Sequence, residues 1–249
     1  MDGQGDTSTT ELRPWVARLM DWNNARVRTV DDGHPNPRPV ESERWHRRLI
    51  EDHPTIRAEW DEFARAGGDI PLIEETLGRP DQNEGSYWKM VPFITRARPV
   101  PTLERFFPAT TTAFLRIPAL QAACWSVLGP GGHIPEHVGL NAGCLRLLVP
   151  VDAEMAAITV GGHQTRFRDG HGVLFEDIVP HEVRNEGDVP RVVVLCDLIR
   201  PVKGVARVHN RVTQWAQFSL TPGYRDCALR GAEHFARRNA DLVATRDGS

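Results

Sequence analysis

Two histidines in the middle of the chain lie where they could bind a metal ion. His137 ends a glycine-rich stretch that begins at Gly131 and precedes a predicted strand, and His181 follows a bend after an apolar segment that ends at Phe175. Imidazole is the commonest metal ligand in proteins and the side chain best suited to proton transfer near neutral pH. Ten histidines are present, but these two, beside predicted strands, fit a metal centre best.

Two arginines occur within strand-like apolar segments. Arg146 alternates with apolar residues, so that it shares one face of its segment with Cys144 and Leu148, and Arg191 begins the most apolar segment of the chain. A guanidinium in such a place is expected to be buried only if it meets an anion, and it binds carboxylates through paired hydrogen bonds. Either a carboxylate ligand or a structural ion pair would satisfy each arginine.

The segments that must position these side chains have the pattern of short strands. Apolar or alternating runs, separated by glycine, proline and asparagine, are found at residues 122–128, 144–149, 156–160, 164–168, 172–175 and 191–199. Many short strands at this spacing are typical of a sandwich or barrel and not of βαβ units. The sequence therefore predicts an antiparallel β-domain of about 110 residues, the size of an eight-stranded jelly roll.

Helices are predicted on both sides of this β-domain. Apolar residues recur at helical spacing around Trp15 and around Ile56, and the second of these helices is expected to begin near Pro54 and to end at Gly67. The chain becomes helical again after Gly204. The predicted organisation is an N-terminal helical region that packs on the barrel (1–86), a core of strands (87–203) and a C-terminal helical extension (204–249).

Composition and charge exclude several classes of protein. The 249 residues include 30 Lys and Arg against 33 Asp and Glu, and the net charge of −3 gives no support for a nucleic-acid or acidic-membrane partner. No apolar run approaches the roughly 18–20 residues of a bilayer span. Residues 1–10 lack the features of a secretory signal, and the four cysteines have no CxxC spacing. We expect a reduced, cytoplasmic protein without nucleic-acid or membrane partners; a homodimer face on the C-terminal helices stays open.

A family resemblance rests on several motifs between residues 106 and 201. They are Phe107-Pro108-Ala109-Thr110-Thr111, Trp125-Ser126, residues 131–139 and residues 175–201. This part of the chain resembles the aspartyl/asparaginyl β-hydroxylase family of Fe(II)- and 2-oxoglutarate-dependent oxygenases. The resemblance implies a mainly β fold with flanking helices, built on a double-stranded β-helix core of the jelly-roll, cupin-like kind.

The resemblance also implies roles for five side chains. His137 and His181 would hold Fe(II), Ser126 and Arg191 would hold the C5 carboxylate of 2-oxoglutarate, and Arg146 would lie near the co-substrate and the substrate carboxylate. The metal centre supplies the chemistry, with O2 as the second co-substrate, and no separate catalytic residue is expected. The implied enzyme is a dioxygenase that hydroxylates an unactivated C–H bond.

The chain departs from the family's aspartyl-peptide hydroxylases beside Arg146. Those enzymes carry a further arginine where this chain has Cys144 and a histidine where it has Leu148. An acidic peptide side chain would lose a positive contact, so an Asp or Asn residue in a peptide is in doubt. A small molecule, an amino acid or another peptide-like substrate, in bacterial specialised metabolism, fits better.

A missing acid leaves two other functions open. The usual 2-His-1-carboxylate site has an acid two residues after its first histidine, but this chain has Gly139 there. The resembled family shares this absence, with water in the vacant position. Related halogenases also have a small residue there, which leaves room for chloride, so a halogenase is one alternative. A non-catalytic cupin-like binding protein is the other.

Four further residues are weaker candidates for the site. Asp177, like its neighbour Glu176, could orient an imidazole or a bound water from outside the metal's ligand set. His133 could contact a ligand or the substrate, since it lies in the same loop as His137. Trp88 could form part of the substrate wall or belong to the packed core.

Overall fold

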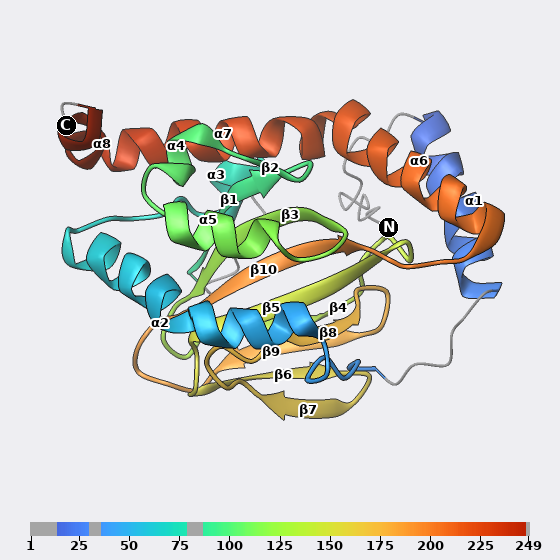
Figure 1. Cartoon of the computed structure of the whole chain (residues 1–249), viewed down its shortest axis with the longest axis horizontal. Helices are drawn as coiled ribbons and strands as arrows, with labels where there is room; N and C mark the ends of the chain where they lie inside the picture. Colours follow the sequence, from blue (N-terminus) through green and yellow to red (C-terminus); the bar gives the residue numbers. More distant parts are fainter. Residues whose placement is uncertain (1–13, 30–35, 79–86, 248–249) are drawn as a thin grey trace, which may run out of the picture.

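The computed structural model describes residues 14–29, 36–78 and 87–247 (Figure 1). Residues 1–10, for which the sequence predicts no secretory signal, lie outside this part of the chain. The helices are α1 (Pro14–Thr29), α2 (Arg44–Arg65), α3 (Ile73–Leu77), α4 (Pro101–Glu104), α5 (Pro108–Leu115), α6 (Gly204–Leu220), α7 (Pro222–Arg238) and α8 (Ala240–Asp247). The strands are β1 (Trp88–Thr95), β2 (Arg98–Pro99), β3 (Leu120–Leu128), β4 (His133–His137), β5 (Cys144–Asp152), β6 (Ala156–Val160), β7 (His163–Arg166), β8 (Val173–Glu176), β9 (His181–Asn185) and β10 (Arg191–Ile199).

Two antiparallel sheets form the centre of the molecule. The larger sheet has the order β2-β1-β3-β10-β5-β8, and the smaller has the order β4-β9-β6-β7. From β3 onward the chain passes back and forth between the two sheets, which is the topology of an eight-stranded double-sheet jelly roll. The predicted fold class, mainly β with flanking helices around a jelly-roll core, is therefore confirmed.

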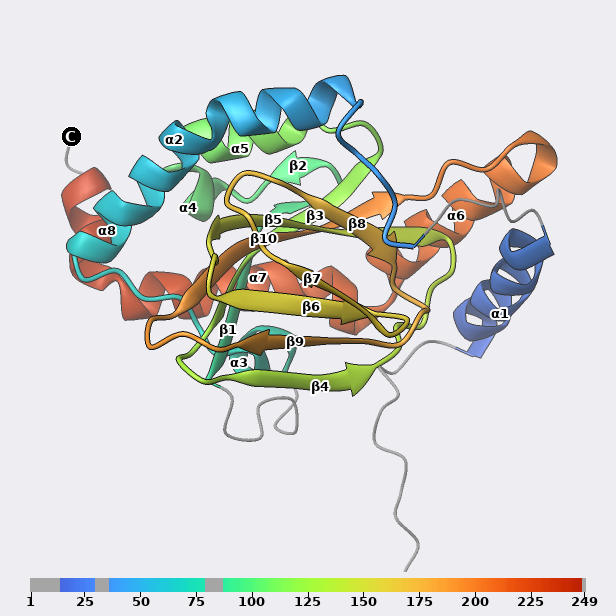
Figure 2. The ribbon, with the colours of Figure 1, turned by 90° about the horizontal axis from the view of Figure 1, so that it is seen from below.

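Strand alternation divides the apolar residues into two cores. On β10, Val192 and Val194 face the helices, whereas Val193 faces the smaller sheet. The outer core joins the large sheet to α2, α5 and α7, which lie on its outer side (Figures 1 and 2). The inner core fills the space between the sheets. The same alternation turns Arg191 toward the inside of the jelly roll.

The predicted strands around residues 122–128, 144–149, 156–160 and 191–199 are confirmed as β3, β5, β6 and β10. The predicted start of a helix near Pro54 is wrong, because α2 begins at Arg44 and contains Pro54 in its interior. Leu49, Ile56 and Phe63 recur every seven residues along α2 and are buried in the outer core. Their burial, about 1.5–3 kcal/mol for each side chain, outweighs the roughly 3 kcal/mol cost of an interior proline.

Helix α1 lies apart from the sheets and packs against α6 at one end of the molecule (Figure 1). The C-terminal part of α7 and the end of α2 lie at the opposite end, where Phe235 stacks on Phe63. Within the described ranges, no helix combines the length and apolar character that a bilayer crossing requires.

Candidate functional site

The two candidate metal ligands lie side by side on neighbouring strands of the smaller sheet. The strand β4, which the sequence pattern does not indicate, ends at His137, so this histidine closes a strand instead of preceding one. The strand β9 begins at His181. The two residues are directly paired in the β4–β9 register, and their ring centroids are 4.2 Å apart. The structure thus brings together two histidines that are 44 positions apart in the sequence.

Both imidazoles are oriented in the same way by the backbone. The Nδ1 atom of His137 lies 2.8 Å from the carbonyl oxygen of Pro135, and that of His181 lies 2.8 Å from the carbonyl oxygen of Val179. A neutral imidazole that donates its Nδ1 proton to a carbonyl keeps a lone pair on Nε2. Metal-binding histidines commonly have this arrangement, in which one ring nitrogen donates to an acceptor and the other is free for the metal.

Burial keeps His181 neutral. The residue is 5% exposed, and burial, with the neighbouring charge of His137, lowers its pKa to about 4. His137 is exposed and lies at the mouth of the space between the sheets. The pair therefore offers two imidazole nitrogens to a metal ion. Among the described residues, no group of three or more His, Cys, Asp or Glu side chains is arranged as a metal site.

Arg191 is a buried cation at the other end of this space. It is 2% exposed, and no carboxylate of the described residues pairs with it. Its NH1 group lies 3.3 Å from Ser126 Oγ and 3.4 Å from the Ser126 carbonyl oxygen, while its Nε has no hydrogen-bond partner in the part of the chain that the structure describes. Burial lowers the pKa of Arg191 to about 9, which leaves it charged at neutral pH. A buried guanidinium without a counter-charge is costly unless an anion binds beside it.

Arg146 has a different environment. Its guanidinium lies 3.1 Å from Asp177 Oδ1 and 3.2 Å from Asp197 Oδ1. Asp197 is the direct cross-strand partner of Arg146 in the β5–β10 register. Burial raises the pKa of Asp197, and the charge of Arg146 opposes this shift. The charge of Arg146 is therefore compensated within the protein. Of the two possibilities that the sequence left open, a carboxylate ligand and a structural ion pair, the ion pair accounts for the burial of Arg146.

A narrow cavity between the sheets joins the histidines to Arg191. It is lined by Trp88, Ser126, Ile134, His137, Arg146, Leu148, Ile158, Phe175, His181, Val183, Arg191 and Leu195. Its open volume is about 40 Å³, so a bound ligand requires lining side chains to move. Trp88 lies at the Ser126 end, where its Nε1 donates to Ser126 Oγ over 3.0 Å. Apart from the two arginines and the two histidines, the walls are largely apolar.

Asp177 occupies the space beside Gly139. The amide of Gly139 donates to the Asp177 carbonyl oxygen over 2.6 Å, and a Cβ atom built on Gly139 would lie 1.7 Å from Asp177 Oδ2. The other carboxylate oxygen of Asp177 lies 3.8 Å from His181 Nε2. A carboxylate is therefore present near the two histidines. It comes from the segment between β8 and β9, and not from the position two residues after the first histidine that supplies it in a 2-His-1-carboxylate site. Gly139 is required here because the carboxylate fills the position of a side chain.

Two neighbouring candidates lie outside the cavity. The Nε2 atom of His133 lies 2.8 Å from Glu182 Oε2, and strand alternation turns the next residue, Ile134, into the cavity instead. Glu176 forms ion pairs with Arg38, at 2.8 Å, and with Arg200 on the outer side of the large sheet. Neither His133 nor Glu176 is placed to contact a ligand between the sheets.

A buried cluster of amide side chains holds the segment that connects His137 to Arg146. Asn141 donates to Gln214 Oε1 over 2.9 Å, and Asn210 donates to the Gly143 carbonyl oxygen over 3.0 Å. Asn23 of α1 donates to Asn210 Oδ1 over 2.9 Å. A Cβ atom on Gly143 would lie 2.0 Å from Asn210 Oδ1. We call this group, Asn23, Asn141, Asn210, Gln214 and Gln217, the amide cluster.

The sequence pattern does not identify the amide cluster, because its members lie in segments that are far apart in the chain. The available signal is the set of amide side chains at helical spacing on α6, where Asn210, Gln214 and Gln217 are buried. Polar residues on the buried face of a helix need partners. This signal indicates a buried polar contact but not its location beside the histidines.

Comparison with known proteins gives a family match and two groups of relatives. Residues 51–201 match the family model described as "Aspartyl/Asparaginyl beta-hydroxylase". The protein named "Ornithine lipid ester-linked acyl 2-hydroxylase", from Rhizobium tropici, is 29% identical over 181 residues, which are 71% of this chain and 63% of that protein. The human "Aspartate beta-hydroxylase domain-containing protein 2" is 40% identical over 108 residues, 41% of this chain and 27% of that protein. The chain thus spans less than two thirds of each relative's length.

Among solved structures, the cupin domain of a transcriptional regulator of the XRE family from Enterobacter cloacae matches 46% of this chain and 98% of that chain. The identity is 18% and the TM-score is 0.34.

Proposed function

The chain belongs to the aspartyl/asparaginyl β-hydroxylase family, a hydroxylase family, and from this membership we propose that it is an Fe(II)- and 2-oxoglutarate-dependent dioxygenase. The observation that carries the proposal is the buried Arg191, which no carboxylate of the described residues neutralises, at one end of a cavity that has two metal-competent imidazoles at the other. The cytoplasmic location expected from the sequence remains part of the proposal.

His137 and His181 would hold the iron. Imidazole suits Fe(II), and both side chains are held by backbone carbonyls in the tautomer that leaves Nε2 available. Fe(II) held there would supply the oxidation of an unactivated C–H bond by O2, with 2-oxoglutarate converted to succinate and CO2. Asp177, 3.8 Å from His181 Nε2, would orient that imidazole or a water beside it.

Arg191 and Ser126 would hold the far carboxylate of 2-oxoglutarate. The carboxylate would neutralise the buried guanidinium and accept from its unpartnered Nε, while the Ser126 hydroxyl would donate a second hydrogen bond. Because the cavity is narrow, the Trp88 indole, which now donates to Ser126 Oγ, would have to move aside. Arg146, which Asp177 and Asp197 hold in ion pairs, would lie beside the co-substrate in the middle of the cavity as a hydrogen-bond donor.

The cavity walls favour a substrate that presents an apolar carbon. Leu148 lies in the wall beside Arg146, together with Ile134, Ile158 and Val183. The Rhizobium relative is named as a hydroxylase of an acyl group in a lipid. We therefore extend the expected substrate, a small or peptide-like molecule, to an acyl chain carried by a polar headgroup.

Hydroxylation is favoured over halogenation by the position of Asp177. A halide would need the space beside Gly139, but an Asp177 oxygen lies 1.7 Å from the position of a Cβ on that residue. A carboxylate and a halide repel each other, so the geometry supports the hydroxylase.

Metal titration tests the proposal. Mn(II), titrated without O2, is expected to bind wild-type protein, and His137→Ala or His181→Ala should each weaken binding by more than the roughly 10–100-fold that loss of an outer partner causes. His163→Ala is the matched control, because His163 is exposed on β7 and outside the cavity. Unchanged Mn(II) affinity in both site variants would contradict the ligand assignment.

2-Oxoglutarate binding gives a second, independent readout. Tryptophan fluorescence should change when 2-oxoglutarate is added to the Mn(II)-loaded protein, because Trp88 must leave Ser126. Trp88→Phe should bind the co-substrate but lose most of this signal. Succinate formed with Fe(II), O2 and a substrate whose acyl chain is carried by a polar headgroup would then establish turnover. A halogenated product in the presence of chloride or bromide would overturn the preference for hydroxylation.

A further inference from the structure

Helix α6 exposes an apolar stripe that packs on nothing in the described part of the chain. Val205, Val208, Val212 and Trp215 lie at positions i, i+3, i+7 and i+10, which fall on one side of a helix. Each is at least 48% exposed. The opposite side of α6 is buried against α1 and the amide cluster, so the stripe faces away from the molecule.

A similar face on α1 adjoins this stripe. Trp15 and Trp22 are seven residues apart and are 48% and 45% exposed. The Trp22 ring packs against His209, one turn beyond Val205 on α6, with ring centroids 4.3 Å apart. We call the exposed apolar residues of the two helices, Trp15, Trp22, Val205, Val208, Val212 and Trp215, the α1–α6 surface.

Positive charge surrounds the α1–α6 surface. Helix α1 carries three arginines and one aspartate, and α6 carries two arginines and no acidic residue. The two helices therefore have a net charge of +4, whereas the whole chain has −3. Arg26 lies over the Trp22 ring at 5.8 Å. Arg207 and Arg211 form no ion pair with any residue in the described ranges.

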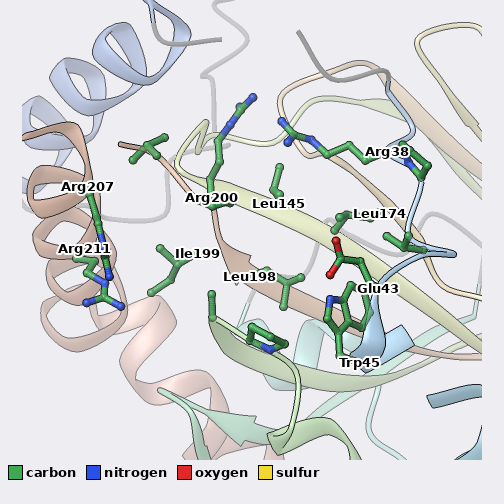
Figure 3. Close-up of a pocket in the computed structure, with 16 residues that line it drawn as sticks. Arg38, Glu43, Trp45, Leu145, Leu174, Leu198, Ile199, Arg200, Arg207 and Arg211 are labelled. Carbon is green, nitrogen blue, oxygen red and sulfur yellow. The ribbon is translucent and has the colours of Figure 1, made fainter. Parts of the chain in front are cut away.

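These two arginines of α6 also line a pocket on the outer side of the large sheet, which has a volume of about 520 Å³. In Figure 3, Arg207 and Arg211 project from α6 on one side, opposite Arg38 and Trp45. Leu145, Leu174, Leu198 and Ile199 form an apolar floor between them. A negatively charged headgroup could bind between the α6 arginines while its apolar part rests on this floor.

The α1–α6 surface is fixed to the segment that follows the metal-site histidine. Val138 and Leu140, directly after His137, are both more than half exposed. Asn24 of α1 donates to the Leu140 carbonyl oxygen over 2.8 Å and accepts from the Ala142 amide over 2.9 Å. Because His137 lies at the mouth of the cavity, a ligand that binds to α1 is held near that mouth.

We propose that the α1–α6 surface docks on a lipid bilayer that contains anionic lipids. Exposed tryptophan and valine beside arginine are the composition of helices that lie in the interface of a membrane. A symmetric dimer through the same face would bring the positive ends of two chains together, which charge repulsion disfavours. The near-neutral total charge hides this surface, so the proposal departs from the sequence expectation of no membrane partner.

The proposal deepens the proposed function, because a lipid-borne acyl chain would reach the cavity mouth from a docked membrane. Its test does not depend on iron or 2-oxoglutarate. Full-length protein without metal is sedimented with vesicles of phosphatidylcholine that contain about one third phosphatidylglycerol, and with vesicles of phosphatidylcholine alone. We expect binding to the anionic vesicles, weaker binding at high salt and little binding to the neutral ones.

Variants locate the contact. Arg207→Glu with Arg211→Glu should weaken binding by about 30-fold or more, since each basic residue near the surface contributes about 1 kcal/mol. Trp215→Ser should weaken it by about tenfold. The controls are Arg65→Glu with Arg237→Glu, at the opposite end of the molecule, and Leu229→Ser, which removes an equally exposed apolar side chain from α7. Neither control should change binding.

Three results would overturn the proposal. The first is no binding to anionic vesicles, and the second is equal binding of the wild type and the α6 variants. The third is a wild-type dimer, measured by light scattering, that Trp215→Ser converts to a monomer, because the surface would then be an interface between two copies. If vesicles bind but Mn(II) does not, the docking surface stands and the iron site fails.

Discussion

Replacement of Arg191 by methionine should make the protein more stable and at the same time remove its affinity for 2-oxoglutarate. Burial lowers the pKa of this guanidinium to about 9, because the low-dielectric interior disfavours its charged form. Methionine has a similar length and no charge. Replacing buried charge by apolar groups of similar volume stabilises proteins by roughly 1–4 kcal/mol, so the Arg191→Met variant should unfold several degrees higher, at roughly 2–4 °C per kcal/mol.

Ligand binding should change in the opposite direction. Truncating one partner of a buried, hydrogen-bonded charge pair costs roughly 2–5 kcal/mol of binding free energy, which weakens 2-oxoglutarate binding by about 30-fold or more. At a concentration about 100 times its dissociation constant, 2-oxoglutarate adds about 2.7 kcal/mol to wild-type stability, or roughly 5–10 °C. The Arg191→Met variant should show little of this increase.

Thermal unfolding followed by calorimetry, with Mn(II) present and with and without 2-oxoglutarate, measures both effects. Arg191→Lys keeps the charge and should retain part of the ligand-induced increase. Arg184→Met, at an exposed arginine of β9, is the matched control and should change stability by less than about 0.5 kcal/mol. If Arg191→Met unfolds at a lower temperature and keeps the full response to 2-oxoglutarate, Arg191 is a structural cation and the reasoning fails.

Three further results are expected. Gly139→Ala should lower the free energy of unfolding by about 1–3 kcal/mol, because its Cβ would meet Asp177 Oδ2 at 1.7 Å. In the double variant with Asp177→Ala, the loss of stability should be smaller than the sum of the losses in the two single variants, and urea unfolding measures all three. Burial and the charge of His171 lower the pKa of His46 in the folded protein. Because the unfolded chain then binds a proton on His46 more tightly than the folded protein does, the free energy of unfolding should fall as the pH drops below 6.5. His46→Gln should make the free energy of unfolding less dependent on pH in the same assay. Burial raises the pKa of the four cysteine thiols, so the folded protein should not react with a thiol reagent at about pH 8 until urea is added. A reaction without urea would contradict the burial of Cys124, Cys144, Cys196 and Cys227.

The sequence predicts those parts of the site that depend on a single segment. The alternation around Arg146 and the apolar run after Arg191 predict two strands of one sheet, and both are confirmed as β5 and β10. The family resemblance pairs His137 with His181, whose rings are in contact in the structure. For the two strands the local pattern contains the information, because strand alternation determines which side chains face inward. The pairing of the two histidines, which joins separate segments, follows from the resemblance alone.

The remaining parts depend on contacts between segments that the sequence does not align. Asp197 lies within an apolar strand, and its role as a counter-charge follows from a register that places it opposite Arg146. Asp177 fills the space beside Gly139 only because the segment after β8 approaches the end of β4. The strand β4 itself contains two histidines, a proline and a glutamate, and its strand conformation comes from pairing with β9 and not from its own propensity.

The amide cluster restricts how this chain can diverge. Its members come from α1, from the segment between β4 and β5, and from α6, and one of its hydrogen bonds joins residues that are 187 positions apart. Replacing one amide by an apolar residue would leave its buried partners without hydrogen bonds, at about 1–3 kcal/mol each. Substitutions in the cluster should therefore be inherited as a set, and homologues should keep all of its members or exchange them together. The same coupling means that a shortened chain without α1 or α6 would also disturb the segment that carries His137, however complete its jelly roll.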